Sequence, residues 1–256
     1  HACVFSKGGK MEYVITIDAG TTNFKVMLYD TKGKVCFSSI RHYWPEFQKN
    51  QKVRQSVESW KNALFGTMRE ISGYLDEKGI LPEAVVVASQ RASVIPFDSS
   101  GTPLCRAFMW QDKTTVAQCD KLSAEIPVRD AYLKTGLRID PYFSAPKIIW
   151  FRENEPDIYR KSAKFAGVQD YIIYLLTGNF VTDHTQASRT LLFDITERKW
   201  SEEMLAAAGV SASLLPDLVP PGSRAGSICK SFSEAAGLRE GTPVLIAGGD
   251  QQAAAI

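Results

Sequence analysis

The fold is decided by the stretch Tyr13-Val-Ile-Thr-Ile-Asp-Ala-Gly-Thr-Thr-Asn-Phe-Lys-Val-Met-Leu-Tyr29. Residues 13–17 are β-branched and mostly apolar, which predicts a buried strand. Residues 18–22 form a polar turn, and residues 24–29 predict a second strand. A hairpin signal, Asp30-Thr-Lys-Gly33, and an alternating run over 35–43 add a third strand. We therefore expect the chain to open with three consecutive antiparallel strands.

Helical periodicity follows this opening. Apolar residues three and four apart predict a helix over 55–76, with Ser56 and Ser59 as candidate caps. The apolar run 84–88 predicts a strand parallel to the first, because a helix intervenes. Further elements are predicted as strands over 94–97 and 243–247, helices over 114–126, 145–153, 168–176 and 201–208, and a Pro/Gly connector over 218–223. The fold class is α/β, with a mixed sheet flanked by helices.

Composition excludes several classes of protein. The 256 residues are 45% hydrophobic and 23% charged, with a formal net charge of +2. This charge does not favour a nucleic-acid partner, and no apolar run is long enough to span a membrane. The five cysteines are scattered without a C-x-x-C pair, which favours free thiols in a reducing, cytoplasmic compartment. The three histidines form no ligand pattern, so we expect no zinc site.

The two ends of the chain differ from its interior. Residues 1–10 lack the apolar core of a secretory signal and are interpreted as a leader or a remnant of expression. Residues 11–256 are interpreted as one domain. The chain stops at Ile256, directly after a strand and the start of a helix, so we expect a second domain to follow it in the complete protein.

The first candidate site is the turn Asp18-Ala-Gly-Thr-Thr22. Gly20 permits close backbone approach, and successive N–H groups in such a turn suit phosphate oxygens. Thr21 and Thr22 add hydroxyl donors, Lys25 can reach the same phosphates, and Asp18 is a candidate ligand for hydrated Mg²⁺. An ordinary hairpin turn with polar side chains is the alternative.

The second candidate site is Gly248-Gly-Asp-Gln-Gln252, which also follows an apolar strand. A carboxylate at Asp250 can take the proton of an attacking hydroxyl that lies within hydrogen-bond reach. The alternative is a helix N-cap, where Asp is favoured, and both roles are compatible.

A third set combines polar and aromatic side chains. Gln90, Arg91, Trp110, Asp112 and the segment Asp140-Pro-Tyr-Phe143 each follow or border an apolar element. Amide and guanidinium donors beside an aromatic wall suit a polyhydroxylated ligand. The alternative is a set of surface polar residues and core aromatics. Two strand-end carboxylates beside this set favour phosphoryl transfer, which requires positioning, Mg²⁺ and an aligned nucleophile.

The chain resembles the FGGY carbohydrate kinases, and among them the glycerol kinases, from Tyr13 to Ile256. The resemblance rests on these segments: Asp18-Ala-Gly-Thr-Thr22, Trp110-Gln-Asp-Lys-Thr-Thr115, Thr135-Gly-Leu137, Asp140-Pro-Tyr-Phe-Ser144, Thr182-Asp-His-Thr-Gln-Ala-Ser-Arg-Thr-Leu-Leu-Phe-Asp194 and Gly249-Asp-Gln-Gln-Ala253.

This resemblance implies an actin-like ATPase fold of two RNase H-like domains, with ATP and a small sugar or polyol in the cleft between them. Residues 11–256 correspond to the N-terminal, substrate-side domain, and the C-terminal ATP-binding domain is absent from this chain. The matched positions imply that Asp250 is the general base, that Asp18 serves Mg²⁺ and that Thr22 contacts phosphate. Substrate contacts are implied for Arg91, Trp110 and Tyr142. Gln251 is also assigned to the substrate-binding residues. The isolated domain is expected to be nearly inactive, and a homodimer stays open as the assembly state.

Two positions depart from the glycerol kinase pattern. Lys25 stands where these kinases have Arg, which keeps the charge but loses the fork geometry. Ala92 stands where they have Glu, so an acceptor for substrate hydroxyls is missing. We therefore expect a changed substrate preference, with a larger sugar or another polyol using the vacated space.

Two alternative classes stay open. A non-catalytic sugar-binding or regulatory protein could retain the fold, although both Asp18 and Asp250 are present. A metal-dependent nuclease of the RNase H-like class is disfavoured by the near-neutral charge and the lack of basic stripes.

Overall fold

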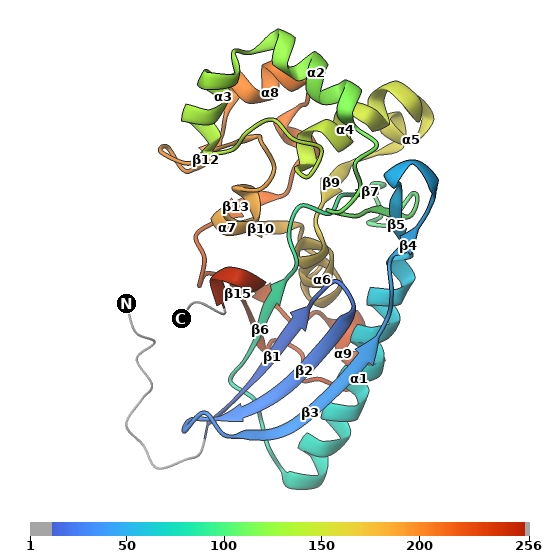
Figure 1. The fold of residues 1–256 in the computed structure, drawn as a ribbon. Coiled ribbons are helices and arrows are strands. Elements are labelled where there is room, and N and C mark those ends of the chain that lie inside the picture. Colours follow the sequence, from blue (N-terminus) through green and yellow to red (C-terminus); the bar gives the residue numbers. More distant parts are fainter. Residues whose placement is uncertain (1–11, 254–256) are drawn as a thin grey trace.

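A six-stranded mixed sheet forms the base of the molecule (Figure 1). The computed structural model describes residues 12–253, so the predicted leader and most of the helical turn predicted over 253–256 lie outside the described part. The strand order is β14-β15-β6-β1-β2-β3. The strands are β1 (Tyr13–Ala19), β2 (Asn23–Asp30), β3 (Val35–His42), β6 (Ala84–Ser89), β14 (Arg224–Ser227) and β15 (Pro243–Gly249).

The register of this sheet confirms the predicted opening. Strands β1, β2 and β3 pair antiparallel, and β6 pairs parallel with β1 on one side and with β15 on the other. The carboxyl ends of β1, β6 and β15 therefore meet at one edge of the sheet. Ligands of α/β sheets bind at such edges, so this edge is the place to examine for function.

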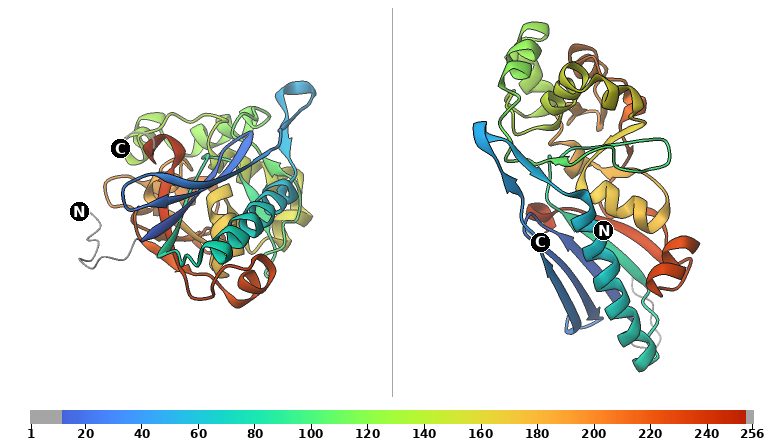
Figure 2. Two further views of the ribbon diagram at one scale, coloured as in Figure 1. Left: turned by 90° about the horizontal axis from the view of Figure 1, so that it is seen from below. Right: turned by 90° about the vertical axis from the view of Figure 1, so that its right-hand side faces the viewer.

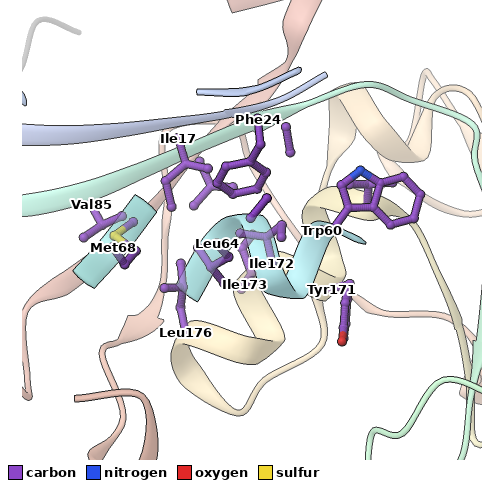
Figure 3. Packing of buried hydrophobic residues seen from close by; sticks show 14 of the residues in the cluster. Ile17, Phe24, Trp60, Leu64, Met68, Val85, Tyr171, Ile172, Ile173 and Leu176 are labelled. Atoms are coloured by element: carbon purple, nitrogen blue, oxygen red, sulfur yellow. The ribbon is translucent and has the colours of Figure 1, made fainter. Parts of the chain in front are cut away.

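One face of the sheet is covered by helices α1 (Val57–Lys78), α6 (Val168–Thr177) and α9 (Lys230–Ala236) (Figure 2). Alternate residues of β1 and β2 are buried against them, as the period of two requires. Figure 3 shows the contact, in which Ile17, Phe24 and Val85 of the sheet face Leu64 of α1 and Ile172 of α6. This packing makes the sheet a rigid base for the edge.

A second region, built mostly of helices, lies above that edge (Figure 1). It has its own apolar core, which includes Phe108, Phe151, Leu192 and Met204. Its helices are α2 (Val116–Glu125), α3 (Val128–Thr135), α4 (Ser144–Asn154), α5 (Pro156–Lys161) and α8 (Glu202–Ala208). The short strands β11 (Phe193–Asp194) and β12 (Lys199–Trp200) form a hairpin beside them.

Short elements connect the sheet to the helical region. They are β4 (Glu46–Phe47), η1 (Lys49–Gln51), β5 (Val53–Gln55), β7 (Ile95–Phe97), β8 (Ala107–Phe108), β9 (Lys164–Ala166), β10 (Val181–Asp183), α7 (His184–Ala187), η2 (Ala212–Leu214), β13 (Asp217–Val219) and α10 (Asp250–Ala253). Within residues 12–253, no helix combines the length and the apolar character needed to cross a membrane.

Two local predictions were wrong. Ser56 occupies the N-cap position of α1, but its side chain makes no capping bond, and the Ser59 hydroxyl donates to its carbonyl instead, at 2.6 Å. The connector over 218–223 contains part of β13, because residues 217–219 pair in parallel with β10. The helix predicted over 114–126 is confirmed as α2 to within two residues at each end, whereas α3, which follows Pro127, was not predicted.

Candidate functional site

The turn after β1 is held by its own backbone and by Tyr43. The Gly20 N–H donates to the Asn23 carbonyl at 2.9 Å, and the Tyr43 hydroxyl donates to the Gly20 carbonyl at 2.8 Å. A Cβ on Gly20 would lie 3.2 Å from the Asn23 carbonyl oxygen, so the tight turn favours glycine here. Thr22 lies at the tip, where its carbonyl accepts from the Tyr43 N–H. The turn is therefore a fixed feature rather than a loose hairpin.

The turn after β15 is formed by a change of direction at Gly248. Its φ is +113°, a conformation that side-chain-bearing residues rarely adopt, and the β15–β6 register shifts at the same place. The Thr185 hydroxyl accepts from the Gly249 N–H at 2.8 Å. Asp250 then begins α10, and its carboxylate accepts from the Gln251 N–H. Asp250 thus lies at the start of a helix, as predicted, directly after a strand end that Thr185 holds in place.

The two predicted carboxylates, Asp18 and Asp250, are brought together at this edge. Burial raises the pKa of Asp18, the negative charge of Asp250 raises it further, and Lys25, its partner across β1 and β2, lowers it. The Asp18 Oδ1 atom is buried and has no hydrogen-bond partner. Two like charges with an unpartnered oxygen are typical of a place where a cation binds.

The residues present fit Mg²⁺. Across the described residues, no group of three or more His, Cys, Asp or Glu side chains converges on one point. Mg²⁺ is commonly bound through one or two carboxylates plus phosphate oxygens and water, and it does not need a cage of protein ligands. Asp18 fits such a role, because it has a buried oxygen without a partner and is close enough to Asp250 for that charge to raise its pKa.

Gln90 and Arg91 directly follow β6 and lie beside these carboxylates. The Gln90 N–H donates to the Ala19 carbonyl at 3.0 Å, which ties the end of β6 to that of β1. The Arg91 guanidinium donates a hydrogen bond to the Gln251 side chain. Burial lowers the pKa of Arg91, and the nearby charge of Asp250 offsets part of that lowering. Gln90 Nε2 and Arg91 Nη1 are buried without partners. Such donors are costly to leave unpaired, so a ligand with acceptor oxygens fits here.

An aromatic wall formed by Trp110 and Tyr142 completes the site. The two ring centroids lie 5.5 Å apart, with an interplanar angle of 52°. The Trp110 indole N–H donates to the Thr21 hydroxyl at 3.0 Å, and that hydroxyl donates to the Gln90 side chain at 3.2 Å. The wall and the first turn are therefore joined by direct hydrogen bonds.

Asp112 was predicted to bind substrate, and in the structure its carboxylate is occupied by protein donors. Its side chain is 0% exposed and pairs with the Arg54 guanidinium. The same carboxylate accepts from the Val53 N–H at 2.6 Å and the Thr114 N–H at 2.9 Å. Because protein donors saturate both oxygens, Asp112 supports the chain around Trp110 instead of offering an acceptor to a ligand.

Ala92 borders a small cavity. Its φ is +64°, unusual for a residue with a side chain, and it is 6% exposed. The cavity has a volume of about 30 Å³ and is also lined by Ser144, Gln186 and Thr190. Arg91, Trp110 and Tyr142 do not line this cavity, so it does not measure the space that is open to a substrate.

Three supporting residues were missed at the level of sequence. They are Tyr43, which holds the first turn, Thr185, which holds the second, and Lys147, whose ammonium donates to three consecutive carbonyls of the loop that carries Tyr142. Thr185 lay within a quoted segment, but nothing in the spacing indicated its partner. Lys147 stands among apolar neighbours in the sequence, and that position was the one available signal.

Comparisons with known proteins agree with this geometry. A model of the N-terminal domain of the FGGY family of carbohydrate kinases matches residues 13–256. A glycerol kinase of Alcanivorax borkumensis is 34% identical over 96% of the chain, and a xylulose kinase of Lactococcus lactis is 29% identical over 96%. The crystal structure of Plasmodium falciparum glycerol kinase with ADP superposes with a TM-score of 0.87 at 28% identity, covering 96% of the chain. The chain spans about half of each: 50%, 49% and 50% of their lengths respectively.

Proposed function

Because the chain belongs to the FGGY family of carbohydrate kinases, we propose that the complete protein transfers the γ-phosphoryl group of ATP to a hydroxyl of a small sugar or polyol. The observation that carries this proposal is the meeting of Asp18 and Asp250 beside the Trp110–Tyr142 wall. The site then combines three neighbouring parts: a carboxylate that can accept a proton, a turn that suits phosphate, and an aromatic wall that suits the C–H face of a sugar or polyol.

Asp250 acts as the general base in this proposal. Its carboxylate accepts the proton of the substrate hydroxyl as that oxygen bonds to the γ-phosphorus, while the bond from phosphorus to the bridging oxygen breaks and releases ADP. Arg91 and Gln251 orient the substrate hydroxyls, and Tyr142 and Trp110 contact its apolar face. N–H groups of the first turn, with Thr22 and Lys25, stabilise charge on the phosphate oxygens. When bound near Asp18, Mg²⁺ supplies charge neutralisation on the phosphates.

The substrate is a small sugar or polyol. Ala92 provides no carboxylate for a substrate hydroxyl, which separates this site from the glycerol kinase pattern and favours a larger sugar or another polyol as the acceptor. The rest of the cleft, including the face that the second domain contributes, limits the size and shape of the substrate.

The domain arrangement is part of the same proposal. Residues 11–256 are the substrate-side domain, residues 1–10 are a leader or a remnant of expression, and a C-terminal domain elsewhere in the complete protein supplies most of the ATP site. Coverage of about half of each relative supports this division. We also keep the cytoplasm as the compartment and a homodimer as the assembly to be tested by light scattering.

ADP release by the full-length gene product tests the proposal. The acceptors are glycerol, other polyols, pentoses and ketoses, each with Mg-ATP. Substrate-dependent release that falls at least about 10²-fold in Asp250→Asn is expected, because a general base contributes roughly 10²–10⁴. Asp120→Asn, a change at an exposed aspartate of α2, is the matched control and should leave release unchanged.

Two outcomes would contradict the proposal. Unaltered release in Asp250→Asn would remove the proton-accepting role. Sugar binding in a thermal-shift panel without any ADP formation would favour the non-catalytic sugar-binding alternative.

A further inference from the structure

Lys147 is a fully buried charged side chain on α4. It is 0% exposed and lies in the first turns of the helix, which begins at Ser144. Burying an ammonium group is costly, and the positive end of a helix dipole disfavours a cation there. Packing alone would therefore favour an apolar residue at this position, so the lysine needs a specific explanation.

The Lys147 ammonium is bound by the loop before its own helix. Nζ donates to the carbonyl oxygens of Pro141 at 2.7 Å, Tyr142 at 2.5 Å and Phe143 at 3.0 Å. These are three consecutive residues, and an ammonium has three donors for them; the neutral amine, which burial favours, keeps two of the three. The negative charge of Asp112 offsets part of the burial cost.

Tyr142 depends on this backbone for its orientation. Its hydroxyl has no hydrogen-bond partner within residues 12–253, and its ring contacts Trp110 and Phe143. Its N–H is held by the Asp140 carboxylate at 2.8 Å. The direction of the ring is thus set by the path of residues 141–143, and that path is set by Lys147.

We propose that Lys147 is a positioning residue that fixes the Tyr142 ring against Trp110 and so shapes the wall on which the sugar or polyol binds. This inference rests on the proposed kinase function for its meaning, but the geometry it invokes does not. In this proposal Lys147 contacts neither the reacting hydroxyl nor the phosphate, and it acts through Tyr142. The expected effect is therefore on acceptor affinity rather than on the chemical step.

Steady-state kinetics of the full-length gene product tests the kinetic part. With the acceptor that supports the highest ADP release, Lys147→Met should raise the KM for that acceptor about tenfold, with kcat and the KM for ATP changed less than about twofold. Lys164→Met is the matched control, because Lys164 also donates to two carbonyls, of Ser213 at 2.9 Å and Leu215 at 2.7 Å, outside the proposed site. The control should leave all three constants unchanged.

A double-mutant cycle separates positioning from general support. If Lys147 acts through Tyr142, Lys147→Met should add less than about twofold to the acceptor KM in a Tyr142→Leu background. An undiminished tenfold effect in that background would overturn the inference. If Lys147→Met does not fold, Lys147→Gln, which retains two N–H donors, carries the same test with a smaller expected rise.

Fluorine NMR provides a readout that does not need activity. In 5-fluorotryptophan-labelled full-length protein, the Trp110 resonance is assigned by its loss in Trp110→Phe. Lys147→Met should shift or broaden this resonance, and Lys164→Met should not. An unchanged Trp110 resonance in Lys147→Met would refute the positioning role even if the protein proved to have no kinase activity, whereas absence of ADP release alone would count against the proposed function.

Discussion

Replacing Asp112 with alanine is the sharpest test of how the site is supported. The Arg54 side chain is 8% exposed and the Asp112 side chain 0%, so the substitution leaves a buried guanidinium without its counter-charge. Arg54 lies over the Phe108 ring at 3.2 Å from its centroid, and this packing prevents it from turning to solvent. Removing one partner of such a pair costs about 3–5 kcal/mol.

The backbone adds to this cost. The N–H groups of Val53 and Thr114 lose their acceptor in Asp112→Ala, and an unpaired buried donor costs about 1–3 kcal/mol. These terms overlap, because water that enters the alanine site satisfies part of them, so we expect a total loss of about 4 kcal/mol. The free energy of unfolding, measured by urea denaturation with the slope fitted for each variant, checks this value.

Glu70→Ala is the control for Asp112→Ala. Glu70 pairs with Arg41 on the surface, where the two side chains are 47% and 39% exposed, so its loss should cost no more than about 1 kcal/mol. A loss below about 1 kcal/mol in Asp112→Ala would refute the structural role argued here. If the same variant kept its stability but lost acceptor affinity, the original prediction of a substrate contact would be correct.

Three further predictions follow from the same geometry. Burial lowers the pKa of Lys147 to about 7, from 10.5, so between these values the unfolded chain holds the extra proton and stability rises with pH by up to about 1.4 kcal/mol per unit; urea unfolding at pH 7, 8 and 9 should show this rise in the wild type and lose it in Lys147→Met, and equal slopes would contradict it. Gly248→Ala should lower the free energy of unfolding by about 1–3 kcal/mol and reduce ADP release, because φ is +113° and the added Cβ would lie 2.8 Å from the Thr185 hydroxyl. Unchanged unfolding and turnover would show that the bend at Gly248 is not needed. Trp110→Phe should cost about 1 kcal/mol by removing the N–H donor to Thr21, and a neutral result in urea unfolding would count against that bond.

The sheet was the most predictable part of the fold. Strands β1, β2 and β3 follow from alternation and turn residues that are contiguous in the sequence. The parallel pairing of β6 with β1 followed from the intervening helix α1, and the structure confirms it. The pairing of residues 217–219 with β10 was not predictable, because such short strands are created by their neighbours and carry no period of their own.

The site was predictable as a set of residues but not as a set of contacts. The turns at Asp18 and Asp250 could be found because each follows an apolar strand, and strand ends meet at one edge. The predicted substrate contact of Asp112 stays a prediction, because sequence gives no measure of whether a carboxylate is already saturated by protein donors, as this one is. Lys147 was missed for the converse reason, since its three acceptors are backbone carbonyls, which every sequence contains.

The order of strands has a consequence for how the protein is made. Strand β6 at the centre of the edge pairs with β1 from the start of the chain and with β15 from its far end. Contacts between such distant segments close long loops and form slowly. During synthesis the three antiparallel strands and α1 can assemble early, but the edge cannot close until residues 243–249 have left the ribosome. A stalled nascent chain that lacks β15 would therefore expose one side of β6 as an unpaired edge, a surface prone to association with other chains.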